Sequence, residues 1–194
     1  RRYGDCKDKT VLLMALLKAM GFSPQAALVN LEQGAALPRQ LPSPYAFDHV
    51  IVSAKLNNQQ YWLDGTDLNQ GTDLNTIGVP YLHYALPVAP DSKDFVSMDD
   101  KYRIAETVLR RELWLDEPGS RLLVEARYSG HEAESQRSSW KDIPPQQITH
   151  QLLGYYSKLY PDLEGTSQPE IKDNLRTNEL VVRQQFSSSA GIDE

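Results

Sequence analysis

Residues 5–21, DCKDKTVLLMALLKAMG, decide how the fold begins. Asp5 is a favourable N-cap residue, Asp8 follows three positions later as in a capping box, and Gly21 stands where helices commonly end. Apolar residues recur between these signals at helical spacing: Val11, Leu12, Leu13, Leu16, Leu17 and Met20. We therefore predict an amphipathic helix over this stretch, with a wide apolar face.

The only cysteine of the chain, Cys6, stands in the first turn of this predicted helix. Its spacing from Leu13, Leu17 and Met20 puts the thiol on the same stripe as those residues, facing the core side. Backbone amides and the helix dipole at a helix N-terminus stabilise an anion, so the position favours a thiolate. Cys6 is therefore a candidate nucleophile that needs a base nearby. A buried structural thiol is the alternative.

A β-hairpin is predicted within residues 47–66, FDHVIVSAKLNNQQYWLDGT. Two β-prone runs flank Asn57-Asn58, and asparagine tolerates the positive φ that a two-residue type I′ turn requires. This turn pairs residue 56 with 59 and residue 51 with 64. Since side chains alternate between the faces of a strand, His49 and Asp64 become diagonal neighbours on one face, within hydrogen-bonding reach.

Cys6, His49 and Asp64 together form a candidate catalytic triad. His49 would take the thiol proton and later protonate the leaving group, while Asp64 fixes the imidazole tautomer. The thiolate would attack an acyl carbon and form a thioester, a reaction that needs no cofactor and no metal. Three alternatives stay open: His49 as a surface or satisfied core histidine, Asp64 as a turn residue, and a metal site that lacks a fourth ligand nearby.

Three blocks of the sequence resemble the motifs of the transglutaminase-like superfamily. They are RYGDCKDKTVLLMALLKAMGF (residues 2–22), FDHVIV (residues 47–52) and YWLDGT (residues 61–66). The resemblance is to a bacterial branch of cysteine proteases in which a β-rich domain follows the core. It implies an α+β, papain-like core whose nucleophile helix packs on an antiparallel sheet. It also implies Cys6 as nucleophile, His49 as base and Asp64 as orienting acid.

The chain departs from this family in two places. Asp64-Gly65-Thr66 stands where relatives usually have Asp-Pro-Thr, which is a mild change in the turn. Papain-like folds also place helices, and usually an oxyanion-hole donor, before the nucleophile, whereas five residues precede Cys6 here. We therefore expect the N-terminal part of the core to be missing from this sequence. The backbone N–H of Cys6 can serve as one oxyanion donor, and the second is not assigned.

A polar, proline-containing stretch at residues 89–101 predicts a domain boundary. The transglutaminase-like core is placed in residues 1–98, and a small β-rich α+β companion domain in residues 99–194. In the second part, strands are expected at 103–115, 121–129, 168–173 and 179–186, helices at 131–142 and 146–159, and a disordered serine-rich tail at 187–189. The role expected for this domain is binding or packing.

One cluster of possible metal ligands lies in the second part, where His131 precedes Glu132 and Glu134. Charge on the solvent-facing side of a helix is the preferred interpretation, so no metal site is predicted there.

The bulk composition restricts the partners. The net charge of -6 argues against nucleic acid or an anionic membrane as a partner. The longest apolar run, residues 11–17, is far shorter than the ~20 residues that a membrane helix needs, so no membrane insertion is expected. A peptide or protein substrate is expected instead. The compartment stays open, with a periplasmic or otherwise extracytoplasmic location as the working expectation.

The leading interpretation is thus a cysteine protease or transglutaminase-like acyltransferase acting on peptide or amide bonds. Hydrolysis is favoured over cross-linking because the resemblance is closest to the protease branch. The alternative is a catalytically silent domain that keeps the fold and serves as a protein-binding or scaffold module.

Overall fold

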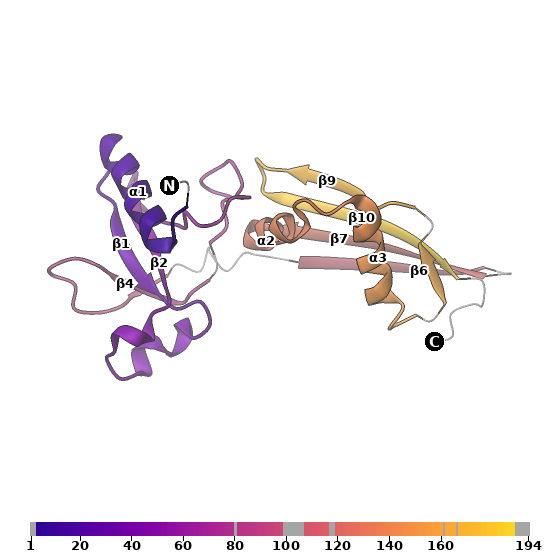
Figure 1. Ribbon diagram of the computed structural model, residues 1–194, viewed down its shortest axis with the longest axis horizontal. Helices are drawn as coiled ribbons and strands as arrows, with labels where there is room; N and C mark the ends of the chain where they lie inside the picture. Colours follow the sequence, from indigo (N-terminus) through magenta and orange to yellow (C-terminus); the bar gives the residue numbers. More distant parts are fainter. Residues whose placement is uncertain are drawn as a thin grey trace. The chain divides into compact units, whose positions relative to one another are not determined.

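The structure is a computed structural model. It describes residues 3–79, 81–98, 107–116, 119–160, 162–165 and 167–188. The chain divides into two compact units: Arg1–Leu68 with Val79–Ile104, and Asn69–Gly78 with Ala105–Glu194. Both units combine helices with an antiparallel sheet, which is the α+β class expected from the sequence (Figure 1). Residues 69–78 belong by their contacts to the second unit. The division expected from the sequence runs at residue 98 and places residues 69–78 in the first unit.

The first unit is built on a sheet of five strands in the order β3-β2-β1-β4-β5, in which every recorded pair is antiparallel. Its elements are α1 (Cys6–Ala19), β1 (Gln25–Val29), two 3-10 helices (Gly34–Arg39 and Pro44–Ala46), β2 (His49–Leu56), β3 (Gln59–Leu63), β4 (Tyr84–Pro87) and β5 (Val96–Ser97). One sheet face carries the apolar core, formed by Ala27, Val29, Ile51, Trp62 and Ala85 with Val79, Leu82 and Met98.

The hairpin of β2 and β3 has the predicted register. Leu56 pairs with Gln59 and Ser53 pairs with Trp62. Asn57 and Asn58 adopt φ values of 50° and 62°, the two positive angles that a type I′ turn requires. The turn chemistry of two asparagines therefore fixes which side chains of β2 and β3 share a face.

Helix α1 begins and ends where the sequence indicates, but its apolar surface is only partly covered. The capping box of Asp5 and Asp8 is present, and Gly21 follows the C-cap with a φ of +89°. The helix contacts β1 and β2, and the Thr10 hydroxyl donates to the Val50 carbonyl at 3.1 Å.

The expectation that Cys6, Leu13, Leu17 and Met20 form one stripe on the core side of α1 is wrong for Met20, which is exposed. Leu13, Met14 and Leu17 are half-buried, whereas four of the other apolar residues are exposed: Val11, Leu12, Leu16 and Met20. The helix is apolar on more than one side, and within the described residues the sheet covers one of them.

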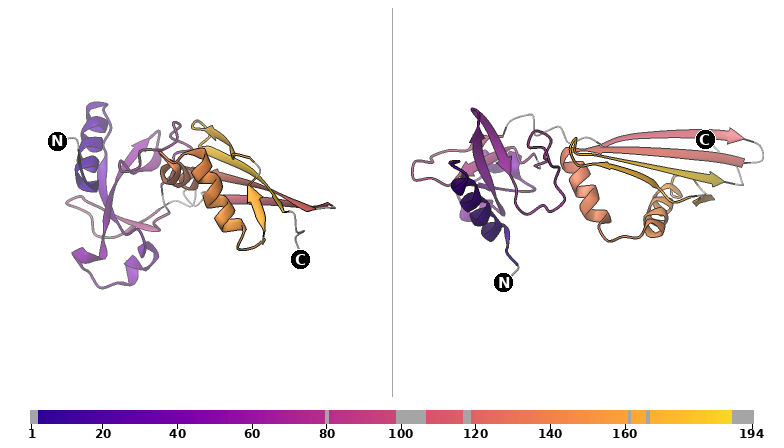
Figure 2. Two further views of the ribbon diagram at one scale, coloured as in Figure 1. Left: turned by 45° about the vertical axis from the view of Figure 1, so that its right-hand side comes forward. Right: turned by 90° about the horizontal axis from the view of Figure 1, so that it is seen from above.

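The second unit is a single sheet with both of its helices on one face (Figure 2). Its elements are β6 (Thr107–Asp116), β7 (Gly119–Ser129), α2 (Gly130–Trp140), α3 (Pro145–Tyr156), β8 (Leu163–Gly165), β9 (Glu170–Asn174) and β10 (Glu179–Ser188). The strand order is β6-β7-β10-β8, and β9 also pairs with β10. Alternate residues of β7 and β10, such as Leu122, Val124, Leu180 and Phe186, are buried against α2 and α3.

The expected elements of the second part agree in type with those described, but their ends differ. Residues 103–106, at the start of the first expected strand, lie outside the described residues, as do residues 117 and 118 between the first two expected strands. The expectation of a disordered tail is wrong for Ser187 and Ser188, which pair in β10 with Arg121 and Ser120. Ser189 lies outside the described residues. No helix in the described ranges has the length and apolar character of a membrane span.

Candidate functional site

Cys6 is the first residue of α1, and the cap of this helix shapes its surroundings. The Asp5 carboxylate accepts hydrogen bonds from the backbone amides of Lys7 and Asp8, at 2.9 and 3.2 Å. The Lys9 amide donates to the Asp5 carbonyl at 3.1 Å. Within the described part of the chain, no intramolecular acceptor is recorded for the amide of Cys6. The first turn therefore leaves the N–H beside the half-buried thiol available for an external acceptor.

His49 and Asp64 are joined directly. His49 opens β2 and Asp64 follows the last residue of β3, so the hairpin register brings them to the same face. The His49 Nε2 atom lies 2.7 Å from Asp64 Oδ2, and the two side chains are only 9% and 10% exposed. The contact expected from the Asn57-Asn58 turn is thus present.

Thr66 completes the environment of the acid. Its backbone amide and its hydroxyl both donate to Asp64 Oδ1, at 2.8 and 2.7 Å. Since Oδ2 accepts from His49, both carboxylate oxygens are engaged and the orientation of the carboxylate is fixed. Thr66 was not among the site residues predicted from the sequence. The available signal was the Asp-x-Thr spacing, because an aspartate commonly accepts from the backbone two residues on.

The electrostatics of the pair follow from burial and these hydrogen bonds. The hydrogen bond to Asp64 is the largest influence on the pKa of His49 and raises it above its ordinary value of 6.5, although burial opposes this. Burial is the largest single influence on Asp64 and acts to raise its pKa. The hydrogen bonds from His49 and Thr66 together outweigh burial, so the pKa of Asp64 lies below its ordinary value of 3.8.

The contact between Nε2 of His49 and the Asp64 carboxylate indicates which imidazole nitrogen can act as a base. An ionised carboxylate only accepts hydrogen bonds, so Nε2 of His49 carries the proton in the contact with Asp64. In the neutral imidazole the lone pair is then on Nδ1. The remaining nitrogen of His49 is therefore the one that can accept a proton from another group.

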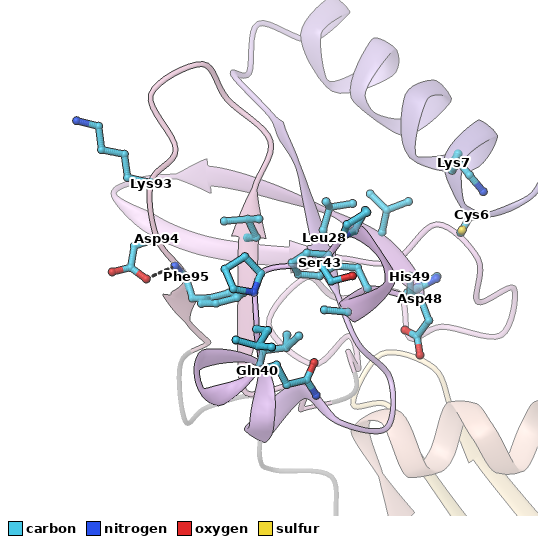
Figure 3. Close-up of a pocket in the computed structure, with 18 residues that line it drawn as sticks. Cys6, Lys7, Leu28, Gln40, Ser43, Asp48, His49, Lys93, Asp94 and Phe95 are labelled. Atoms are coloured by element: carbon cyan, nitrogen blue, oxygen red, sulfur yellow. Dashed lines mark hydrogen bonds between the residues drawn. The ribbon is translucent and has the colours of Figure 1, made fainter.

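Cys6 and His49 lie together at one end of a groove of about 540 Å³ (Figure 3). The sulfur of Cys6 points toward the side of the groove on which His49 lies, while Asp64 is not among the lining residues. The structure therefore brings the predicted nucleophile and the predicted base to a common hollow, with the predicted acid behind the base.

The interpretation of Glu134 as a solvent-facing charge is wrong, because this residue of α2 is fully buried. Its Oε1 atom accepts from the backbone amides of Gly71 and Gly78, at 3.0 and 2.8 Å, and from the Asn178 side chain at 2.7 Å. Glu132 is exposed, as expected. Glu134 thus holds residues 69–78 in the second unit, an anchoring role that the local helical pattern could not reveal.

Comparison of the chain with family models, curated proteins and solved structures gave no match. The transglutaminase-like assignment and its papain-like core therefore stay predictions from the sequence blocks.

Proposed function

We propose that the first unit is a transglutaminase-like core that carries out thiol-dependent acyl chemistry on peptide or amide substrates. The observation that carries this proposal is the arrangement around His49. Its Nε2 is held by a buried Asp64 at 2.7 Å, and its ring lines the same groove as the thiol of Cys6. A nucleophile, a base and a group that orients the base are the parts that covalent acyl transfer needs.

In the first half of the reaction, Nδ1 of His49 accepts the proton of the Cys6 thiol as the sulfur attacks the acyl carbon. The carbonyl π electrons move onto oxygen, and the N–H of Cys6 is placed to donate to the resulting oxyanion. Collapse of this intermediate breaks the bond to the leaving amine, which takes the proton from His49. The acyl group remains on Cys6 as a thioester.

In the second half, water or an amine attacks the thioester while His49 accepts its proton. Collapse releases the acyl product, and the proton returns from His49 to the sulfur. Asp64 stabilises the imidazolium in both halves and keeps Nδ1 directed away from itself. Hydrolysis is favoured over transfer to an amine, because the sequence blocks resemble the protease branch most closely.

The test is to trap the thioester. The protein is incubated with 4-nitrophenyl acetate, and the intact mass is measured before and after treatment with hydroxylamine. We expect one acetyl adduct on Cys6 that hydroxylamine removes. The adduct should be absent in Cys6→Ser and should form much more slowly in His49→Gln.

His150→Gln provides the matched control, since His150 is exposed on α3 and takes no part in the site. An adduct that forms at the same rate in His49→Gln as in His150→Gln would contradict the proposed roles. The complete lack of an adduct on a folded protein would favour the alternative, a silent domain that serves as a binding or scaffold module.

A further inference from the structure

The groove beside Cys6 and His49 has a mostly apolar wall away from its catalytic end. Leu28 pairs with Val50 on one side and with Leu86 on the other, so these three side chains form a row across β2, β1 and β4 on one sheet face. Leu28 and Leu86 are only half-buried and line the groove. Phe47 and Phe95 add aromatic surface, with ring centroids 6.2 Å apart. The wall therefore offers apolar contact area in the same groove as the thiol.

The charges along the groove balance, because two lysines and two aspartates line it. Asp48 accepts from the Leu31 amide at 2.9 Å, and Asp94 accepts from the Phe95 amide at 2.8 Å. Lys93 extends away from the groove in Figure 3. A substrate side chain that contacts Leu28, Leu86 and the two phenylalanines would lose water against apolar atoms, which favours an apolar side chain there.

The apolar surface continues beyond the groove. A second hollow of about 490 Å³ shares Leu28 and Leu86 with it and is otherwise lined by residues 87–90 and Ser92. All of these except Ser92 are apolar. Leu28 and Leu86 therefore form a wall common to both hollows. The apolar surface that they begin in the groove continues into the second hollow.

We propose that this groove is the specificity subsite for the acyl half of the substrate, and that it selects a bulky apolar residue beside the reacting carbonyl. This inference rests on the proposed function. The acyl half is the half that stays bound to Cys6 between the two steps, so contacts to it act on both of them. Leu28, Leu86 and Phe95 are the residues that determine the preference, which runs to aromatic and branched aliphatic side chains and against charge of either sign.

The experiment measures how fast Cys6 is alkylated by N-acetyl-aminoacyl chloromethyl ketones that differ only in the side chain. In this reaction the sulfur forms a bond to the methylene carbon, chloride leaves, and the thiol proton passes to His49. Each rate is divided by the rate for iodoacetamide, which carries no side chain. We expect the phenylalanyl and leucyl reagents to exceed the glycyl reagent by about 10- to 100-fold, and the aspartyl and lysyl reagents to show no such gain.

Leu86→Lys should remove most of this gain, because it places a charge in the wall. Leu31→Lys is the matched control, since Leu31 is an exposed leucine of the same unit that lines neither hollow. Equal normalised rates for all side chains, or an equal loss in both lysine variants, would overturn the subsite.

The failure of the proposed function gives a different result. In that case iodoacetamide labelling itself would not depend on His49. Binding of an apolar side chain in the groove would then be tested by titrating N-acetyl-phenylalaninamide into the protein and following backbone amide NMR signals. Saturable shifts centred on Leu28, Leu86 and Phe95 would support an apolar binding groove, and their absence would overturn it.

Discussion

Replacement of Asp64 by asparagine tests the pair on which the site depends. The side chains of His49 and Asp64 are 9% and 10% exposed and meet at 2.7 Å. A hydrogen bond between charged groups of this kind contributes about 1.5–3 kcal/mol to the free energy of unfolding. In the variant, Thr66 can still donate twice to the side-chain oxygen, which turns the new NH₂ group toward His49. We therefore expect a folded protein with a weakened pair.

The pH dependence of this loss has a definite sign. The pKa of His49 is raised in the folded state, so its contribution is fully present below 6.5 and is lost as the pH rises through the folded-state pKa. The pKa of Asp64 is lowered, so its contribution is present above 3.8 and is lost as the pH falls through its folded-state pKa. The pair therefore stabilises the fold most between these two ordinary values. Between about pH 5.5 and 8.5 Asp64 stays ionised, so the pH dependence of the pair's contribution to stability comes from His49 and not from Asp64.

The assay is urea unfolding followed by the fluorescence of Trp62, which is buried in the core of the first unit. Trp114→Phe and Trp140→Phe in both proteins leave Trp62 as the sole tryptophan. We expect Asp64→Asn to lower the free energy of unfolding by about 1.5–3 kcal/mol at about pH 5.5, and by less at about pH 8.5. If the loss of unfolding free energy in Asp64→Asn stays constant or grows from about pH 5.5 to 8.5, the pKa of His49 is not raised by Asp64.

Three further predictions concern the frame of the site. Asp5→Ala should lower the midpoint of thermal unfolding and slow Cys6 alkylation, because the first turn loses its cap; an unchanged midpoint would show that the cap is dispensable. Glu134→Ala should lower the free energy of unfolding by at least about 2 kcal/mol and speed hydrogen exchange of the Gly71 and Gly78 amides, which lose their acceptor. Unchanged exchange would show that Glu134 does not hold residues 69–78. Asn58→Val should cost about 1–2 kcal/mol in chemical denaturation because φ is 62° there, whereas Asn58→Gly should cost little; equal costs would rule out a conformational cause.

Local chemistry made the hairpin and the helix start predictable from the sequence. A two-residue turn of asparagines allows one register, and the register fixes the faces of His49 and Asp64. The capping box at Asp5 and Asp8 is likewise contained within four residues. These signals are short-range and depend on backbone geometry alone, so they can be recognised in the sequence before the fold is known.

The features that the sequence did not predict depend on contacts between distant segments. Glu134 follows a surface-like helical pattern, and its burial comes from Asn178 and the backbone of residues 69–78. The groove wall likewise joins Leu28 and Leu86, which are far apart in sequence and neighbours across β1 and β4. Helical periodicity showed that α1 is apolar, but it could not show which of its sides the sheet covers.

We propose that His49 activates Cys6, and this activation can be measured as the rate of Cys6 alkylation by iodoacetamide across about pH 4–10 in the native protein and in His49→Gln. Because the chain has one cysteine, the labelling signal comes from Cys6 alone. We expect fast labelling that persists below about pH 7 in the native protein and is lost in His49→Gln, as for a thiolate paired with an imidazolium. Labelling that rises only in the range of a free thiol, with the same profile in both proteins, would contradict it.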